Sequence, residues 1–320
     1  MADPKLARIR LRHLETFLAV SRLGNLRAAA QALSVSQPAV TKTISELEEI
    51  LGVRLFDRGR RGARPTVDAE RFLPHASASL GALALAVQSV AGPNAPPPIR
   101  LGVLPTVAPS FVPRALLALR AVMPQADLRI ESAPNRELLL QLQQRRLDVV
   151  VGRLSDPTEM AGLTFEHLYA DSLALVVRPG HPLLNGPASD WSAESLLRFD
   201  LVLPTAGTII AHSADTLLRA HGVSPVRAWV ETLSVSLGRG LVRASDAVWC
   251  VPHSAVEPDL AAGWLVALPW STQGSQEPIG LLLPNDALIP EALNSDALRA
   301  LITVLRREAA GRMSQILSRP

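Results

Sequence analysis

The sequence contains very little cysteine, few charged residues and no long apolar run, and each shortage excludes a class of protein. Its 320 residues include one cysteine, Cys250, which excludes an internal disulfide framework and a cysteine-based zinc site. No stretch approaches eighteen consecutive apolar residues, which excludes a membrane-spanning helix. Charged residues make up 19% and hydrophobic residues 48% of the chain, so it can bury a sizeable core and is not a disordered polyampholyte.

The motifs of common enzyme classes are also missing. There is no Gly-x-Ser-x-Gly elbow, no Walker A loop, no complete Gly-x-Gly-x-x-Gly and no His-Glu-x-x-His. Gly238 and Gly240 begin a dinucleotide-like fragment, but Arg243 stands where the third glycine should be. The histidines show no metal-ligand spacing, and Cys250 lies in an apolar run typical of a core. We therefore expect no enzymatic activity, no metal and no cofactor.

Positive charge is concentrated in the first quarter of the chain. Residues 1–92 hold 13 Lys and Arg against 8 Asp and Glu, whereas residues 93–320 hold 19 against 21. This asymmetry favours nucleic acid as the partner of the first segment. Residues 1–8 contain no apolar run typical of a secretory signal, so we expect a cytoplasmic protein without a membrane partner.

A proline-rich stretch, Ala91–Pro98, divides the chain into two parts. It holds four prolines and a glycine in eight residues, which cannot continue a helix and are typical of a stiff linker. Before it the apolar spacing is helical throughout. After it, short β-rich runs alternate with helical runs, which predicts an α/β domain with a largely parallel sheet.

The first part predicts a helix-turn-helix. A helix is expected from about residue 11, a second over 28–33 with Asn25 as its N-cap, and a third that Ser36 caps and Gly52 ends. Pro38 falls in the first turn of the third helix, where a missing N–H does no harm. Two helices joined by so tight a turn are typical of the DNA-binding motif.

Polar residues open the third helix, at the end that enters a major groove in such motifs. Gln37 can pair with adenine, Thr41 can contact a thymine methyl or a phosphate, and Lys42 can meet guanine or phosphate. The alternative is that these residues form an ordinary solvated helix face.

An arginine-rich segment follows that helix directly. A β-hairpin wing that grips phosphates or a minor groove explains its composition, although an arginine-rich surface loop is the alternative. The arginines concerned are Arg58, Arg60, Arg61 and Arg64. The next predicted helix, over 67–90, is rich in Ala and Leu and apolar enough to need a partner, so we interpret it as a dimerising helix.

The thirty residues Ala29–Arg58 resemble the DNA-binding signature of LysR-type transcriptional regulators. One departure follows the wing, where Ala69 stands in place of the usual glycine of a Leu-Thr-x-x-Gly run. The resemblance covers the whole chain. It implies an α+β multidomain protein with an N-terminal winged helix-turn-helix, a linker helix, and a C-terminal two-lobed α/β effector domain like a periplasmic solute-binding protein. The DNA-binding residues that we expect are Arg27, Ser36, Gln37, Pro38, Thr41, Lys42, Arg58, Arg60, Arg61 and Arg64.

The expected domains follow from this resemblance and from the proline-rich stretch. They are a DNA-binding domain over 1–66, a linker helix over 67–92, a hinge over 93–98 and an effector domain over 99–310. Within the effector domain we expect lobe I over about 99–175 and 272–310, and lobe II over about 176–271. The resemblance also implies an operator in double-stranded DNA, a small-molecule inducer, dimers or tetramers, and RNA polymerase as a further partner.

Strand-to-helix turns in the second part indicate where an effector would bind. Strands are expected over 99–104, 128–131, 149–152 and 201–203, the first of them followed by a helix beginning at Pro105-Thr106 and the second by a helix over 137–145. The end of a parallel strand facing a helix N-terminus is a ready anion site. Capping alone also explains the hydroxyl and amide residues there, and Arg153 can equally be a surface arginine. The expected effector-binding residues are Pro105, Thr106, Asn135, Arg153, Thr205, Gly207, Thr208, Glu231, Thr232 and Arg239.

A narrower resemblance concerns the effector. The stretches Gly152–Tyr169 and Val176–Leu183 are similar to the branch of the family that contains the regulator of the protocatechuate operon. This implies activation by a carboxylated intermediate of aromatic degradation, for which Arg153, Arg239, Arg243 and His212 are cationic candidates. A branch that regulates sugar-binding-protein genes is also similar, and a neutral sugar would instead want amides, hydroxyls and an aromatic face.

Three other classes remain as alternatives. An α/β enzyme would need one of the missing motifs. A free-standing solute-binding protein would need a signal peptide and no residues 1–92. A purely architectural DNA-binding protein would not need the second domain.

Overall fold

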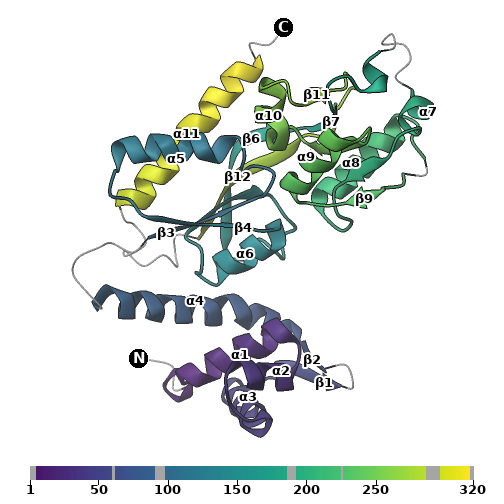
Figure 1. The fold of residues 1–320 in the computed structure, drawn as a ribbon. Helices are drawn as coiled ribbons and strands as arrows, with labels where there is room; N and C mark the ends of the chain where they lie inside the picture. Colours follow the sequence, from purple (N-terminus) through teal and green to yellow (C-terminus); the bar gives the residue numbers. More distant parts are fainter. Residues whose placement is uncertain are drawn as a thin grey trace.

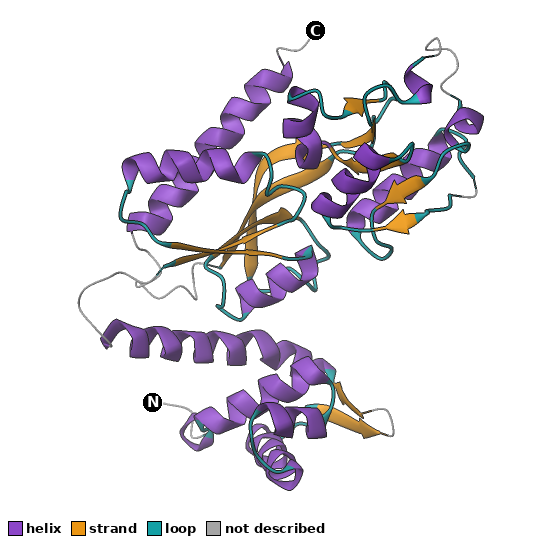
Figure 2. Cartoon of the chain, in the orientation of Figure 1, coloured by secondary structure: helices purple, strands orange, loops and turns teal. Residues whose placement is uncertain are grey.

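The chain forms a helical head, a long helix and a two-lobed α/β body (Figure 1). The computed structural model describes residues 5–59, 62–90, 98–185, 192–224, 226–285 and 296–317. Helices cover the faces of the two sheets in the body, and a small hairpin projects from the head (Figure 2). None of the helices in these ranges is long and apolar enough to cross a membrane.

The head is a winged helix-turn-helix. After a short 3-10 turn, Leu6–Arg8, come α1 (Leu11–Leu23), α2 (Leu26–Ala32), α3 (Gln37–Leu51) and a hairpin of β1 (Phe56–Gly59) and β2 (Gly62–Pro65).

The predicted N-caps Asn25 and Ser36 and the predicted end of the third helix at Gly52 are confirmed, although α2 covers Leu26–Ala32 where the sequence predicted 28–33. The Asn25 side chain accepts hydrogen bonds from the N–H groups of Arg27 and Ala28, and the Ser36 hydroxyl accepts one from Ala39. Gly52 ends α3 with a left-handed φ of 77°. The apolar faces of the three helices and the start of the hairpin meet in one core. The largest side chains of this core are Phe17, Ile44, Leu47, Leu55 and Phe56.

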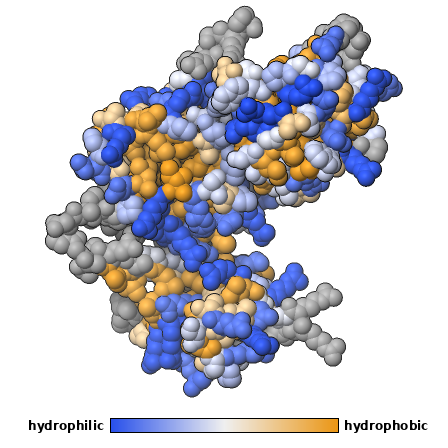
Figure 3. Space-filling model, viewed as in Figure 1, coloured by the Kyte–Doolittle hydropathy of each residue, from blue (hydrophilic) through white to orange (hydrophobic). Residues whose placement is uncertain are grey.

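The long helix α4 (Val67–Val90) begins at the residue that the sequence predicted and continues to Val90, the last described residue before 98. Its first turns pack into the head core through Ala69, Phe72 and Ala76. Further along, Leu83 and Val87 are 45% and 59% exposed, so this end carries an uncovered apolar stripe. Figure 3 shows apolar surface along α4 and over the α5 side of lobe I. Residues 93–97 of the predicted hinge lie outside the described residues.

Lobe I is built on a five-stranded sheet in the order β4-β3-β5-β12-β6. Its strands are β3 (Ile99–Val103), β4 (Leu128–Ser132), β5 (Val149–Arg153), β6 (Leu163–Asp171) and β12 (Glu277–Pro284). β3 runs parallel to β4 and β5, and β12 runs antiparallel to β5 and β6. The helices are α5 (Phe111–Val122) and α11 (Asp296–Leu317), which pack against each other, and α6 (Asn135–Gln143).

Lobe II has a second five-stranded sheet in the order β11-β7-β10-β8-β9. Its strands are β7 (Leu173–Val177), β8 (Leu201–Leu203), β9 (Val230–Glu231), β10 (Val248–Pro252) and β11 (Val266–Ala267). Its helices are α7 (Ala193–Leu196), α8 (Ile209–Ala220), α9 (Val235–Ala244) and α10 (His253–Ala261), with a 3-10 turn at Pro182–Leu184. Cys250 lies in the central strand β10 and is buried, as the sequence predicted.

The chain crosses between the lobes twice. The first crossing is at Ser172, because Asp171 still pairs with β12 of lobe I while Leu173 already pairs with β10 of lobe II. This point lies a few residues before the expected lobe boundary near 175. The return crossing lies between β11 and β12. The two crossings meet where the Leu173 N–H donates to the Ser275 hydroxyl at 3.1 Å, and together they form the hinge of the body.

One helix begins later than the sequence suggested. We expected a helix from Pro105-Thr106, but α5 begins at Phe111, and residues 105–110 form turns. Pro109 has no N–H to donate to the carbonyl of Pro105, so a helix could not propagate through this stretch. The turns leave Thr106 buried near the hinge instead of capping a helix.

Candidate functional site

The predicted DNA-reading residues share one exposed face at the start of α3. Gln37, Pro38 and Lys42 are exposed and Thr41 is half-buried, whereas Val40 and Ile44 turn into the head core. Arg27 is exposed at the start of α2, and Ser36 serves as the N-cap of α3. The structure thus brings these residues together on a surface that the core leaves free for a groove.

A glutamate on α3 ties this helix to α1. Glu46 pairs with Arg12 at 2.9 Å and with His13 Nε2 at 3.2 Å. His13 Nδ1 accepts a hydrogen bond from the Arg10 N–H, so the ring proton sits on Nε2 and is donated to Glu46. The His13 hydrogen bond, with Arg12, holds the pKa of Glu46 below its usual value. Lys42 lies 4.0 Å from Glu46 with its side chain 79% exposed, so its ammonium remains available to DNA.

The wing is fixed to the head by three sets of hydrogen bonds. Glu48 Oε1 accepts from the N–H groups of Leu55 and Phe56, and the Ala63 N–H donates to the Gly24 carbonyl at 2.8 Å. The Thr66 hydroxyl donates to the Arg54 carbonyl at 2.8 Å and closes the base of the hairpin. The hairpin is therefore anchored to α3 through Glu48 and to the residue after α1 through Gly24.

The four wing arginines are described to different extents. Arg64 is exposed on β2, and Arg58 lies in β1. Arg60 and Arg61 lie outside the described residues.

A pocket of about 160 Å³ lies between the two lobes. It is formed where β3 and β5 end and where α6 and α8 begin, which is the kind of position that the strand-to-helix turns predicted. Its lining residues are Leu104, Pro105, Thr106, Pro134, Asn135, Arg136, Arg153, Ser155, Glu159, Gly207, Thr208, Ile209, Ile210 and Leu233.

Arg153 is the buried cation of this pocket, with a side chain 5% exposed. Its Nη1 donates to the Thr106 hydroxyl at 3.4 Å, and its Nη2 lies 3.9 Å from Asp171 Oδ2. Both Nε and Nη2 are buried without a hydrogen-bond partner. Burial lowers the pKa of Arg153, and the nearby carboxylates of Asp171 and Glu277 oppose that shift. One edge of the guanidinium thus has two N–H groups without an acceptor.

Asn135 holds Arg153 in place. Its Oδ1 accepts from the Arg153 N–H at 2.9 Å, and its Nδ2 donates to the Arg153 carbonyl at 3.1 Å and to the Ser155 hydroxyl at 2.9 Å. Both N–H bonds of the amide are therefore in use. Asn135 lines the pocket, but its amide is bonded to the backbone of Arg153 at the end of β5.

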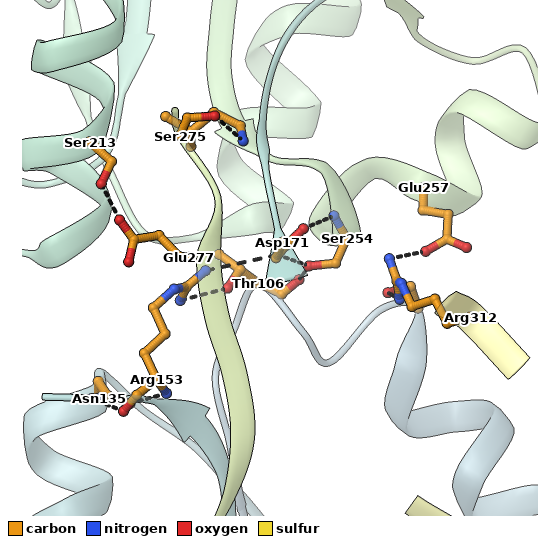
Figure 4. A network of polar contacts seen from close by, with 12 residues as sticks. Thr106, Asn135, Arg153, Asp171, Ser213, Ser254, Glu257, Ser275, Glu277 and Arg312 are labelled. Atoms are coloured by element: carbon orange, nitrogen blue, oxygen red, sulfur yellow. Dashed lines mark hydrogen bonds and ion pairs between the residues drawn. The ribbon is translucent and has the colours of Figure 1, made fainter. Parts of the chain in front are cut away.

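Two carboxylates at the hinge were not among the expected site residues. Asp171 accepts from the N–H and the hydroxyl of Ser254, the N–H lying at 3.1 Å (Figure 4). Glu277, which faces Asp171 across β6 and β12, accepts from the hydroxyl of Ser213. Each carboxylate on a lobe I strand thus binds a serine of lobe II. No local pattern marks these residues, because they meet only through the order of the strands.

Three further expected effector residues make hydrogen bonds within lobe II. Thr205 accepts from the Thr208 hydroxyl through its carbonyl, Glu231 accepts from the Ala206 N–H, and Thr232 accepts from the Ser234 N–H. Thr205, Glu231 and Thr232 do not line the pocket.

The other cationic candidates lie away from Arg153. Arg239 lines an adjoining groove and pairs with the buried Asp259 at 2.8 Å. Arg243 stacks over Trp264 at 5.3 Å, and His212 is exposed on α8. The structure therefore brings Pro105, Thr106, Asn135, Arg153, Gly207 and Thr208 together and leaves these cations outside the pocket.

Comparison with known proteins agrees with this two-part layout. The model described as "Bacterial regulatory helix-turn-helix protein, lysR family" matches residues 11–70, and "LysR substrate binding domain" matches residues 95–310. The chain is 41% identical over 310 residues to the HTH-type transcriptional regulator PcaQ of Agrobacterium fabrum, which covers 96% of each chain.

Two further proteins are similar. The uncharacterized HTH-type transcriptional regulator YdcI of Escherichia coli K12 is 41% identical over 283 residues, covering 88% of this chain and 91% of that protein. The solved structure of full-length LysG from Corynebacterium glutamicum with bound effector Arg superposes with a TM-score of 0.60 at 18% identity, covering 95% of this chain and 99% of that one. The last likeness concerns the fold alone.

Proposed function

The chain belongs to the LysR family of bacterial transcriptional regulators, and from this premise we propose that it activates an operon for aromatic-acid breakdown when a small carboxylate binds between its lobes. Members of the family bind operator DNA and small-molecule effectors and form oligomers. The proposal therefore concerns the class of effector, the kind of operon and the direction of regulation. Membership of this family favours a regulator over the enzyme and the solute-binding protein that the sequence left as alternatives.

The observation that carries the proposal is one edge of Arg153, where Nε and Nη2 are buried without a hydrogen-bond partner and Nη2 has only the 3.9 Å ion pair with Asp171. Two N–H groups on one side of a guanidinium match the two oxygens of a carboxylate, which they can bind side by side. Burial makes this match strong, because a buried donor left without a partner costs about 1–3 kcal/mol. An anionic effector that reaches this edge from the pocket would satisfy both groups.

The rest of the pocket supports an acid with an apolar body. Six of its lining residues are apolar: Leu104, Pro105, Pro134, Ile209, Ile210 and Leu233. None of the described residues that line it is aromatic, whereas a sugar ring typically stacks on an aromatic face. The lining thus disfavours the alternative function, which is regulation of a sugar or other solute uptake operon. The 41% identity to PcaQ supports the aromatic-acid branch.

On the DNA side, two copies of the chain would read two half-sites of a near-palindromic operator. Gln37, Thr41 and Lys42 would face base edges or phosphates, and the wing arginines would neutralise phosphates. The exposed stripe of Leu83 and Val87 on α4 is suited to pairing with the same stripe of a second copy. Effector binding would then shift the population between two arrangements of the heads.

The test is ligand-induced thermal stabilisation of the full chain. The panel contains protocatechuate, benzoate, muconates, carboxymuconates, amino acids and simple sugars. A ligand that binds only the native state raises the midpoint of unfolding as its concentration exceeds its dissociation constant. We expect acids to stabilise the protein and Arg153→Met to abolish the effect. Arg129→Met, the same change at an exposed position of lobe I, is the matched control.

Either outcome of that test is informative. Stabilisation by acids in the wild type and in Arg129→Met, but not in Arg153→Met, supports the proposed effector class. Stabilisation by a sugar alone, or by acids equally in all three proteins, overturns it and leaves the family unchanged.

A further inference from the structure

A second connection between the lobes involves Glu257, on α10 of lobe II. Glu257 Oε2 lies 2.5 Å from Arg312 Nη2 on α11, and its Oε1 lies 3.8 Å from Arg114 Nη1 on α5. Both arginines belong to lobe I. One carboxylate of lobe II is thus held by two helices of lobe I. We refer to Glu257, Arg312 and Arg114 as the latch.

Arg312 is fixed on three sides. Its side chain is 7% exposed, its Nη1 donates to the Ser110 hydroxyl at 3.3 Å, and its guanidinium lies 4.7 Å from the centre of the Tyr169 ring. Opposite charges attract more strongly where little water screens them, and parting them leaves a buried charge unpaired. The contact with Glu257 is therefore costly to lengthen.

The latch and the effector pocket lie on opposite sides of the hinge (Figure 4). Arg153 and Asn135 are on one side, Glu257 and Arg312 are on the other, and the Asp171–Ser254 contact lies between them. Ser254 and Glu257 are both on α10, three residues apart, so one rigid helix spans the distance from hinge to latch. A rotation of lobe II about an axis through the Asp171–Ser254 contact would move the two sides in opposite senses.

We infer that the latch opposes closure of the lobes and thereby sets the affinity of the pocket from outside it. Closing the pocket side turns α10 away from α5 and α11, which lengthens the contacts of Glu257. Effector binding must shift the lobes toward the closed state, and this shift breaks the contacts of Glu257. The free energy needed to break them therefore weakens the binding of the effector. The inference about lobe angle stands on geometry alone; the consequence for affinity rests on the proposed function.

The first experiment measures the lobe angle of the full chain without ligand. Spin labels are placed on cysteines introduced at Glu137 of α6 and Thr216 of α8, both of which are exposed. Burial raises the pKa of Cys250 to about 12, so the native thiol does not compete for the label. The distance distribution between the labels is recorded by pulsed electron resonance for the wild type and for Glu257→Gln.

The matched control is Glu166→Gln. Glu166 pairs with Arg306 at 2.7 Å, so it also joins a glutamate to an arginine of α11, but both partners belong to lobe I. Arg114→Gln is a milder second variant, since Arg114 is the outer and 43% exposed partner of Glu257.

The expected result is a shift toward shorter label distances in Glu257→Gln, a smaller shift in Arg114→Gln, and none in Glu166→Gln. Unchanged or longer distances in folded Glu257→Gln and Arg114→Gln would overturn the inference. Protocatechuate titration is the second readout, and Glu257→Gln is expected to bind it about fivefold more tightly than the wild type. If no acid binds any of the proteins, the proposed effector fails while the distance data still decide the role of the latch.

Discussion

Asn135 bonds both the N–H and the carbonyl of Arg153, 18 residues further along the chain. This pair of hydrogen bonds joins the start of α6 to the end of β5 and fixes the direction in which the Arg153 side chain leaves the sheet. The pocket therefore depends on an amide that has no N–H left to offer a ligand.

Replacing Asn135 tests this positioning role. Asn135→Ala removes three hydrogen bonds of the amide, and we expect a loss of about 1–3 kcal/mol in the free energy of unfolding. Urea denaturation of the full chain provides the measurement. Gln125→Ala, at an exposed amide of the same lobe, should change the free energy by less than about 0.5 kcal/mol. Equal effects of the two changes would contradict the role given to Asn135.

Arg153→Lys tests whether the planar edge of the guanidinium matters beyond its charge. Lysine keeps the positive charge but cannot offer two parallel N–H groups to a carboxylate. We expect binding of the acid that stabilises the wild type to weaken by about 1.5–3 kcal/mol, which is tenfold or more. Calorimetric titration measures this, and unaltered affinity in the folded variant would show that the charge alone suffices.

On α3, Gln37→Ala should reduce discrimination between bases. A good bidentate contact distinguishes the right base from the wrong one by about 1–3 kcal/mol, so the ratio of operator to non-specific affinity should fall. An operator selected from random DNA and a scrambled duplex provide the two affinities. A loss of equal size on both duplexes would assign Gln37 to the phosphates instead.

Arg64→Ala should weaken binding to the operator and to the scrambled duplex alike, in contrast to Gln37→Ala. An exposed wing arginine that neutralises a phosphate contributes to every sequence, so affinity should fall on both duplexes. The slope of log affinity against log salt should decrease by about one. Arg129→Ala, in the effector domain, should alter neither quantity. A change in base preference without a change in salt slope would place Arg64 in a groove.

Cys250 should be unreactive in the native protein. Burial raises its pKa from 9.0 to about 12, so at pH 8 the thiolate that reacts with disulfide reagents is absent from the folded state. Unfolding in guanidinium should expose one fast-reacting thiol.

The sign of the pH dependence follows from the same shift. The folded state holds the proton more tightly than the unfolded state, so the contribution of Cys250 to stability is full below about pH 9 and is lost as pH rises toward 12. Cys250→Ala should flatten this part of the stability profile. A native thiol that reacts as fast as the unfolded one would contradict the burial of β10.

The head could be predicted from the sequence in detail, because its signals are local. Asn25, Ser36 and Gly52 act within three or four residues of their own positions, and α4 begins at the predicted residue, Val67. The sequence predicts the first helix of lobe I from Pro105, but α5 begins at Phe111, because Pro109 lacks the N–H that a helix through this stretch would need.

The site could be predicted only in part, because its geometry depends on strands that are distant in the sequence. Arg153 and Thr106 follow strand ends and were found for that reason. Asp171 and Glu277 come together through the pairing of β6 with β12, which are more than a hundred residues apart. Arg239 carries the right charge, but Asp259, one helix further on, pairs with it.

The position of β12 has a consequence for synthesis on the ribosome. This strand lies between β5 and β6 in the sheet of lobe I, yet it is made after all of lobe II. The head and lobe II are each continuous in the chain and can fold as they emerge, N-terminal parts first. Until Glu277–Pro284 has left the exit tunnel, β5 and β6 have an open space between them. The nascent lobe I thus exposes two unpaired strand edges, and it is the last part of the molecule to become protected from aggregation.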